Sequence, residues 1–220
     1  YSNITINKNK ITENLKSEKF YVLNNFNGLE FKLFDQFTNT FFNLPLDLED
    51  TNYIEFIKNH SGNKNILYIN KPRDVESFVL DFIKTLPNIE NIENDKDYLA
   101  IQNYSHKDYK LLGCLKKGVV YHHASMPDII KLYVEKVFSK NPNFKYIITT
   151  STLLEGVNIP AEKMFLLSYK KGKNKLSKSQ FKNLIGRVCR FSEIFNTDRT
   201  NLKLLIPEIY IIDLSLIHIS

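Results

Sequence analysis

From residue 52 onward, short apolar runs alternate with segments of helical periodicity, and this alternation restricts the fold more than any other feature of the chain. Residues 74–86 and 128–138 place their apolar side chains three and four residues apart, as an amphipathic helix does. Pro72 and Pro127 stand near the starts of these segments, where a first helical turn begins. Short buried strands alternating with helices predict an α/β domain whose parallel sheet has helices on its faces. The apolar runs are residues 66–69, 98–101, 119–121, 146–148, 165–167 and 209–212.

The first fifty residues lack this regularity. Residues 20–37 indicate one or two strands, broken at Asn24-Asn25 and at Asn27-Gly28, and the second break is a hairpin signal. Residues 44–50 have the composition of a linker. We therefore expect a lead-in and linker over residues 1–50 and the main domain over residues 51–215. We interpret residues 216–220 as a non-native tail.

The composition excludes several classes of protein. Hydrophobic residues make up 43% of the chain and charged residues 25%, which is typical of a globular domain and not of a disordered or collagen-like chain. No apolar run approaches the roughly 20 residues that span a bilayer, so no membrane segment is predicted. The two cysteines, Cys114 and Cys189, are isolated, which argues against a disulfide scaffold and against a metal site. A reducing, cytoplasmic location is the expectation.

The positive charge is concentrated in one segment. The chain has 30 lysines and arginines against 24 acidic residues, a net charge of +6. Between residues 163 and 190 there is no aspartate or glutamate. A field of this sign attracts polyanions such as nucleic-acid backbones and nucleotide phosphates, although a solvated basic surface would give the same pattern. The basic residues of this segment are Lys163, Lys170, Lys171, Lys173, Lys175, Lys178, Lys182, Arg187 and Arg190.

Hydroxyl side chains follow the apolar run at residues 146–148. Thr149, Thr150, Ser151 and Thr152 come directly after it, and Gly156 lies four residues further on. In an open parallel sheet, ligands bind beyond the carboxyl ends of the strands, where hydroxyl groups can donate to phosphate oxygens. The alternative is structural, because Ser151 or Thr152 could simply cap a helix.

Two arginines stand three residues apart near the end of the basic segment. On a helix this spacing brings Arg187 and Arg190 to one face, where each guanidinium group can form a forked contact with phosphate oxygens. A salt-bridged or solvent-facing pair is the alternative. His122 and His123 end another apolar run, and alternate side chains of a strand face opposite ways, so at most one of them points at a ligand.

These blocks together resemble the C-terminal RecA-like domain, or helicase C domain, of superfamily 2 DEAD/DEAH-type helicases, and are most similar to the Ski-type branch. Residues 65–70 resemble motif IV, residues 120–127 the histidine-containing block that follows it, residues 149–161 motif V, and residues 183–190 motif VI. The four blocks occur in the right order over roughly residues 55 to 213. The resemblance implies a RecA-like parallel sheet with helices on both faces, the second motor domain of such a helicase.

The resemblance also implies roles for individual residues. Asn158, presented by a loop that Gly156 shapes, would bind the ribose of ATP, and Asn183 would belong to the same nucleotide site. Arg187 and Arg190 would be arginine fingers that reach the γ-phosphate and stabilise charge in the transition state. The nucleic-acid backbone, DNA or RNA and single-stranded, would be contacted by Asn70, His123, Ser125, Thr149, Thr150 and Ser151.

This sequence departs from the family pattern in places. Asn183 stands where glutamine or histidine is usual, and Lys131 stands where arginine is usual, which removes a forked contact but keeps the charge. The block at Ala124-Ser125 commonly has glycine followed by a small or acidic residue. These substitutions weaken the assignment to a subfamily more than the assignment of the fold.

The chain contains neither the G-x-x-x-x-G-K-[ST] loop nor the acidic box that cradle phosphates and hold Mg²⁺ in such motors. We therefore expect no ATP hydrolysis by this chain alone. We expect it to be part of a longer helicase whose N-terminal RecA-like domain supplies the Mg²⁺ site. Two alternatives remain: a free-standing RecA-like module that binds nucleic acid or protein without motor activity, and an unrelated doubly wound nucleotide-binding protein. The second lacks support, because it needs a glycine-rich first turn and the chain shows none.

Overall fold

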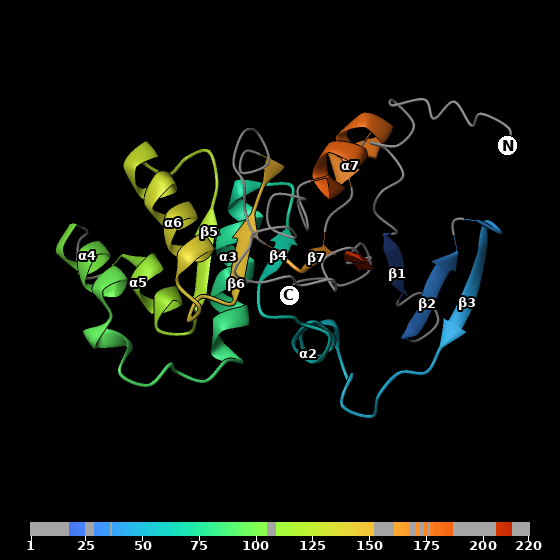
Figure 1. Ribbon diagram of the computed structural model, residues 1–220, viewed down its shortest axis with the longest axis horizontal. Helices are drawn as coiled ribbons and strands as arrows, with labels where there is room; N and C mark the ends of the chain where they lie inside the picture. Colours follow the sequence, from blue (N-terminus) through green and yellow to red (C-terminus); the bar gives the residue numbers. More distant parts are fainter. Residues whose placement is uncertain are drawn as a thin grey trace, which may run out of the picture.

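The computed structural model of the protein describes residues 18–24, 29–35, 37–104, 109–151, 161–167, 170–171, 174–175, 177–186 and 206–212. Its central element is an eight-stranded sheet with the strand order β3-β2-β1-β10-β7-β4-β6-β5, which runs across the whole molecule in Figure 1. The strands of this sheet are β1 (Lys19–Asn24), β2 (Glu30–Asp35), β3 (Thr40–Leu44), β4 (Asn65–Tyr68), β5 (Val119–His122), β6 (Tyr146–Thr149), β7 (Lys163–Leu166) and β10 (Glu208–Ile212). A separate antiparallel pair is formed by β8 (Lys170–Lys171) and β9 (Asn174–Lys175).

Helices connect most of the parallel strands. Proline stands at the first position of the helix that follows β4 and at the N-cap of the helix that follows β5, as the sequence predicts. The helices are α2 (Tyr53–Asn59), α3 (Pro72–Lys84), α4 (Lys96–Tyr104), α5 (Lys110–Leu115), α6 (Asp128–Lys140) and α7 (Lys178–Ile185), with a short 3₁₀ turn, η1, at Ile92–Asn94.

The sheet is mostly parallel. All strand pairs from β1 through β10, β7, β4 and β6 to β5 run in the same direction, and only β2 and β3 are antiparallel to their neighbours. The central strands β4, β5 and β6 are buried along their whole length, as expected for strands covered on both faces. This confirms the predicted α/β class and is consistent with a RecA-like domain.

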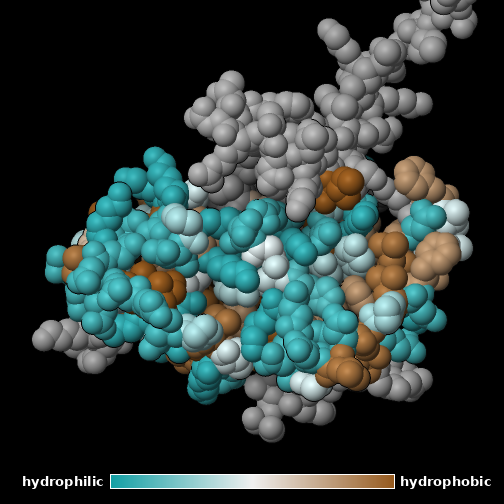
Figure 2. Space-filling model, turned by 60° about the horizontal axis from the view of Figure 1, so that its bottom comes forward, coloured by the Kyte–Doolittle hydropathy of each residue, from teal (hydrophilic) through white to brown (hydrophobic). Residues whose placement is uncertain are grey.

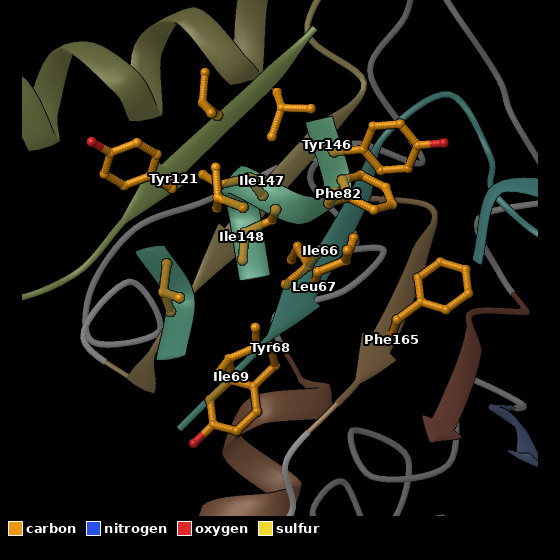
Figure 3. Packing of buried hydrophobic residues seen from close by; sticks show 14 of the residues in the cluster. Ile66, Leu67, Tyr68, Ile69, Phe82, Tyr121, Tyr146, Ile147, Ile148 and Phe165 are labelled. Atoms are coloured by element: carbon orange, nitrogen blue, oxygen red, sulfur yellow. The ribbon is translucent and has the colours of Figure 1, made fainter. Parts of the chain in front are cut away.

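Helices cover both faces of the sheet. Residues paired in register share a face, so Tyr146 and Tyr210 lie on one face and Phe20 and His122 lie on the other. On the first face, Phe82 of α3 packs edge-on against Tyr146 with ring centroids 5.0 Å apart, as Figure 3 shows, and α2 packs against Tyr210. On the second face, α6 contacts His122 and α7 packs on Phe20.

The core follows the parallel strands. Every residue of β4, β5 and β6 is buried, and Figure 3 shows Ile66, Leu67 and Ile148 close together at the centre of the cluster. Near Tyr210 the core becomes aromatic, because Phe165 and Tyr21 stack on its ring with centroids 4.8 and 4.7 Å away. Offset aromatic stacking adds to the free energy gained from apolar burial.

One predicted strand is a helix. Residues 98–101 lie inside α4, and Asp95 stabilises its first turn by accepting hydrogen bonds from the backbone N–H groups of Asp97 and Tyr98. Tyr98 and Ile101 are the two buried residues of α4, and their spacing of three is helical. The prediction of a strand was wrong because periodicity cannot distinguish a short buried strand from a short helix in a run of four residues.

Three strands come from the first fifty residues. The predicted strand region corresponds to β1 and β2, which pair as an antiparallel hairpin, and β3 adds a further strand that the sequence did not indicate. They extend the same sheet through the pairing of β1 with β10. The domain boundary at residue 50 stays a prediction.

The end of the sheet at β2 and β3 presents exposed aromatic side chains. Phe37, Phe41 and Phe42 are exposed there at 86%, 57% and 51% of their surface. Figure 2 shows brown, hydrophobic surface gathered at this end of the molecule. β3 is the edge strand of the sheet, so its outer backbone groups have no partner strand within the described residues.

A glycine closes the turn between α5 and β5. Gly118 has a φ of +69°, a conformation that residues with a side chain rarely adopt. Its carbonyl accepts hydrogen bonds from the backbone N–H groups of Lys145 and Tyr146, at 2.9 and 3.2 Å. The turn therefore fixes the start of β5 against the start of β6.

Candidate functional site

The predicted nucleic-acid contacts lie together at the carboxyl edge of β4, β6 and β5. His122, Thr149 and Tyr68 are aligned in register as the last residues of these strands. Asn70 follows β4 and Ser151 follows β6 at the same edge. The remaining predicted residues, His123, Ser125 and Thr150, also follow β5 and β6 directly. The structure thus brings together six residues from three separate blocks of the sequence.

These six residues differ in their access to solvent. Ser125 is exposed, and Asn70 and Ser151 are half-buried. In contrast, the exposed fractions of Thr149, Thr150 and His123 are 0%, 2% and 4%. Only the first three present side-chain surface to a ligand in this conformation.

Hydrogen bonds hold the carboxyl edge in shape. The backbone N–H of Ile69 donates to the carbonyl of Thr149 at 2.9 Å, and that of Thr150 donates to the carbonyl of His122 at 3.4 Å. The hydroxyl of Thr149 donates to the carbonyl of Thr150 at 3.0 Å. The buried threonine thus uses its hydroxyl group to fix the backbone that leads to Ser151.

His122 is anchored to the helical layer on one face of the sheet. Its Nε2 lies 3.0 Å from Oε1 of Glu135 on α6, and both side chains are buried. Burial lowers the pKa of His122 to about 4, and the positive charge of Lys131 acts in the same direction. The imidazole is therefore neutral at pH 7, and we assign its proton to Nε2, which donates to Glu135. Nδ1 has no hydrogen-bond partner among the described residues.

His123 is directed to the opposite face. Its Nε2 lies 3.4 Å from Oε1 of Glu76 on α3, a long contact in which neither ring nitrogen reaches hydrogen-bond geometry with a described residue. Glu76 also accepts a hydrogen bond from Lys110 at 2.9 Å, and this bond holds the pKa of the Glu76 carboxyl below its usual range. Burial lowers the pKa of His123, and the Glu76 carboxylate opposes the shift. The His123 ring stacks on Tyr121.

Both histidines are therefore packed side chains, each beside a carboxylate from a different helical layer. The sequence predicted their opposite directions but not their partners. Glu135 and Glu76 were missed as parts of the site. For Glu135, the sequence signal was its position on the apolar face of α6, three residues before the fully buried Phe138 and next to Val134. A carboxylate at such a position needs a polar partner.

Most of the predicted nucleotide site lies outside the described residues. This applies to Gly156, Asn158, Arg187 and Arg190. Asn183 is described and is exposed on α7, whose Leu184 and Ile185 face the core. No hydrogen bond or ion pair with a described residue joins Asn183 to the carboxyl-edge cluster. The arrangement of the nucleotide site stays a prediction.

The lysines of the basic segment, residues 163–190, differ in their surroundings. Lys163, its first residue, forms a 2.8 Å ion pair with Glu208 of the neighbouring strand β10. The acid that pairs with it is thus distant in sequence and adjacent in the sheet. Lys182 on α7 is exposed.

Two negative findings apply to the part of the chain that the structure describes. It contains no group of three or more histidine, cysteine, aspartate or glutamate residues that could hold a metal ion. None of its helices is long and apolar enough to cross a bilayer.

Comparison with known proteins gives partial matches to helicases. No protein-family model matches the chain. A stretch of 135 residues is 27% identical to the "Helicase POLQ-like" protein of Caenorhabditis elegans and covers 58% of this chain and 14% of that protein. A stretch of 99 residues is 36% identical to "Probable ATP-dependent DNA helicase HFM1" of Homo sapiens and covers 43% of this chain and 7% of that protein.

An archaeal relative gives the same result. The chain is 29% identical over 85 residues to "ATP-dependent DNA helicase Hel308" of Aeropyrum pernix, which is 37% of this chain and 11% of that protein. The chain therefore spans only a small part of the length of these relatives. The similarity to superfamily 2 helicases is distant and partial, and the mostly parallel sheet is consistent with a RecA-like domain.

Proposed function

We propose that this chain is the second motor domain of an ATP-dependent nucleic-acid helicase or translocase, of the Ski-type branch, acting on single-stranded nucleic acid. The observation that carries the proposal is the group of polar residues at the carboxyl ends of three adjacent parallel strands, where open α/β sheets bind their ligands. The partial similarity to proteins named as DNA helicases supports it and favours DNA over RNA.

Within this proposal, the accessible residues contact the strand and the buried residues shape the edge. Ser125, Ser151 and Asn70 can donate hydrogen bonds to phosphate oxygens, contacts that position a strand without selecting a sequence. Thr149, Thr150 and His123, predicted as contacts, would in the present conformation support the backbone beneath them. A motor that steps along any sequence needs this kind of contact.

The ATP site would be shared with another domain. Asn183, Asn158 and Gly156 would bind the nucleotide, and Arg187 and Arg190 would approach the γ-phosphate when the two motor domains close. The Mg²⁺ site would be contributed by the first motor domain. Hydrolysis of ATP bound between the two motor domains would supply the energy for stepping. This chain would contribute positive charge and ribose contacts to the ATP site.

Strand binding is tested first on the chain itself. The double variant Asn70→Ala with Ser125→Ala should weaken binding of a fluorescein-labelled dT20 oligonucleotide by roughly thirtyfold, since two lost contacts to charged phosphates of about 1 kcal/mol each add to about 2 kcal/mol. The matched control is Asn88→Ala with Ser61→Ala, which removes the same two types of side chain at the opposite edge of the sheet. Equal affinities of the two double variants, measured by fluorescence anisotropy at two salt concentrations, would refute the interface.

The motor role is tested in the longer protein that contains a first motor domain. Arg190→Ala should lower nucleic-acid-stimulated ATP hydrolysis by about 10³-fold or more if it is an arginine finger. Lys84→Ala, at the exposed last residue of α3 and away from the carboxyl edge, is the control and should keep normal turnover. Unchanged hydrolysis in Arg190→Ala would refute the arginine-finger role. A longer protein that binds the strand but hydrolyses no ATP would instead support the alternative of a binding module without motor activity.

A further inference from the structure

A second concave surface lies at the opposite edge of the sheet. A groove of about 560 Å³ is formed by α4, the second half of α6 and the turn that leads from α6 into β6. Since α6 ends at Lys140 and β6 begins at Tyr146, the groove lies at the amino ends of the strands. It is therefore separate from the candidate nucleic-acid interface. We call it the α4–α6 groove.

The acidic side chains of this region are used within the framework. Oδ1 of Asp97 accepts a hydrogen bond from the Tyr133 hydroxyl at 3.1 Å, and Oδ2 accepts one from Asn141 at 2.8 Å. Asn141 also donates to Asp95 at 3.0 Å, and Asn143 donates to the same Asp95 oxygen at 3.3 Å. This network ties α4 to the end of α6 and gives the groove a fixed floor.

The basic side chains of the groove are not used in this way. Lys96, Lys136 and Lys140 line it, are exposed, and form no ion pair with any residue that the structure describes. Three lysines against the one lining carboxylate, Asp97, give the groove a formal charge of +2. The positive side chains are thus left for a ligand of opposite charge.

An apolar stripe on the same helix continues the groove. Ile129 and Leu132 on α6 are exposed at 57% and 66% of their surface. They lie three residues apart, and Leu132 is one turn before Lys136, so the four residues Ile129, Leu132, Lys136 and Lys140 follow one side of α6. The helix therefore presents aliphatic surface along its first half and positive charge along its second half.

We propose that the α4–α6 groove and this stripe form a docking site for an acidic peptide segment of a partner protein, one that carries aliphatic anchor side chains among aspartates or glutamates. Aliphatic anchors would cover Ile129 and Leu132, and spaced carboxylates would pair with the three lysines. A nucleic-acid strand fits the stripe less well, because its bases stack on aromatic rings and Ile129 and Leu132 are aliphatic. The site goes beyond the proposed motor function and does not depend on it.

The probe is a fluorescein-labelled, sixteen-residue synthetic peptide with leucine at every third or fourth position and glutamate elsewhere. A peptide with lysine in place of glutamate tests the charge, and a peptide with serine in place of leucine tests the anchors. Fluorescence anisotropy should show binding of the first peptide, and at least about tenfold weaker binding of the other two, since both contributions are required.

Paired variants of the chain locate the site. Lys136→Glu with Lys140→Glu should weaken peptide binding by about tenfold or more, and Leu132→Ser by about fivefold. The matched controls are Lys71→Glu with Lys84→Glu and the single variant Leu80→Ser, which make the same changes on α3 and should stay within about twofold of the parent. Circular dichroism and thermal unfolding of all variants verify that the fold is retained.

Three outcomes would overturn the proposal. One is equal weakening by the α3 controls, which would show only a general effect of net charge. Another is failure of the parent chain to bind the acidic peptide. The last is binding of a dT20 oligonucleotide that is lost in the Lys136→Glu, Lys140→Glu variant and kept in Leu132→Ser, because the surface would then belong to a nucleic-acid strand. The first two results do not bear on the Asn70 and Ser125 variants, so the docking site can fail while the motor function stands.

Discussion

The two ends of the sheet are built in opposite ways. At the β5 end, the strands are parallel, their residues are fully buried, and helices cover both faces. At the β3 end, the strands are antiparallel, and four of the five residues of β3 are exposed. The first end has its polar groups in defined contacts at the strand termini, while the second end presents phenylalanine to solvent.

The strands of the two halves therefore have different structural roles. In the parallel half, the buried strands pair in a fixed register. This register places Thr149 and His122 side by side, and Asn70 follows the neighbouring strand at the same edge. In the hairpin half, the strands add width to the sheet but carry none of the predicted site residues. Mutations in the parallel half should therefore lower the free energy of unfolding more than mutations in the hairpin half, and only the former should alter the candidate site.

The largest expected effect is the loss of a core aromatic ring in the parallel half. Phe165→Ala should lower the free energy of unfolding by about 3–5 kcal/mol, because Phe165 is fully buried and stacks on Tyr210. Phe41→Ala at the exposed edge should cost less than about 0.5 kcal/mol. Urea titration followed by circular dichroism measures both, and similar losses would contradict the difference between the two ends.

A smaller effect is expected at the turn that starts β5. Gly118→Ala should cost about 1–3 kcal/mol, since φ is +69° and the new Cβ would lie 2.6 Å from the backbone carbonyl oxygen of Asn143. Gly113→Ala, nearby in α5, is the control: nothing lies within 4 Å of its Cβ, and alanine favours a helix. That variant should be neutral or more stable. A comparable loss for the two alanines would show that the turn conformation is not what matters.

The pH dependence tests the buried histidine at the same end. The folded-state pKa of His122 is about 4, below its unfolded value of about 6.5, so the unfolded chain takes up a proton first as the pH falls. The free energy of unfolding should therefore decrease from about pH 6.5 towards pH 4. His123 shifts in the same direction, and Glu135, whose pKa burial raises, opposes it. His122→Gln should flatten this part of the profile, and an unchanged slope would mean that the histidine is already protonated in the fold.

The smallest effect is expected at the seam between the two halves. α2 covers this seam, since Phe56 packs against Phe31 of β2 and Tyr210 of β10. Asn52 caps α2 by accepting hydrogen bonds from two backbone N–H groups, at 2.9 and 3.1 Å. Asn52→Ala should cost about 1 kcal/mol, and Asn52→Asp should restore most of it. Thermal unfolding compares the two, and a loss that aspartate does not restore would place the role of Asn52 outside capping.

The sequence predicted the strands of the parallel half, whereas in the hairpin it indicated β1 and β2 and missed β3. Strands β4, β5, β6, β7 and β10 are short apolar runs, a pattern that results from burial on both faces. β3 was missed because Thr40–Leu44 has no alternation of polar and apolar residues. The run at residues 98–101 was assigned to a strand because a length of four fits both element types.

The candidate site was predictable in position but not in partners. Strand ends in a parallel sheet meet at one edge, so Asn70, Thr149 and His123 could be placed together from sequence alone. The partners of the two histidines, Glu76 and Glu135, approach from helices distant in the chain. Contacts of this kind are set by how the layers pack, and no local pattern encodes them.

The two adjacent histidines have a mechanical consequence. One side chain of the β5 end reaches α6 and the next reaches α3, so the strand end is joined to both layers within a single step of the backbone. If either layer slid past the sheet, a contact between strand and helix would have to break. Force applied at this edge is therefore shared by both layers, and the edge and its two helices would be displaced as one stiff unit.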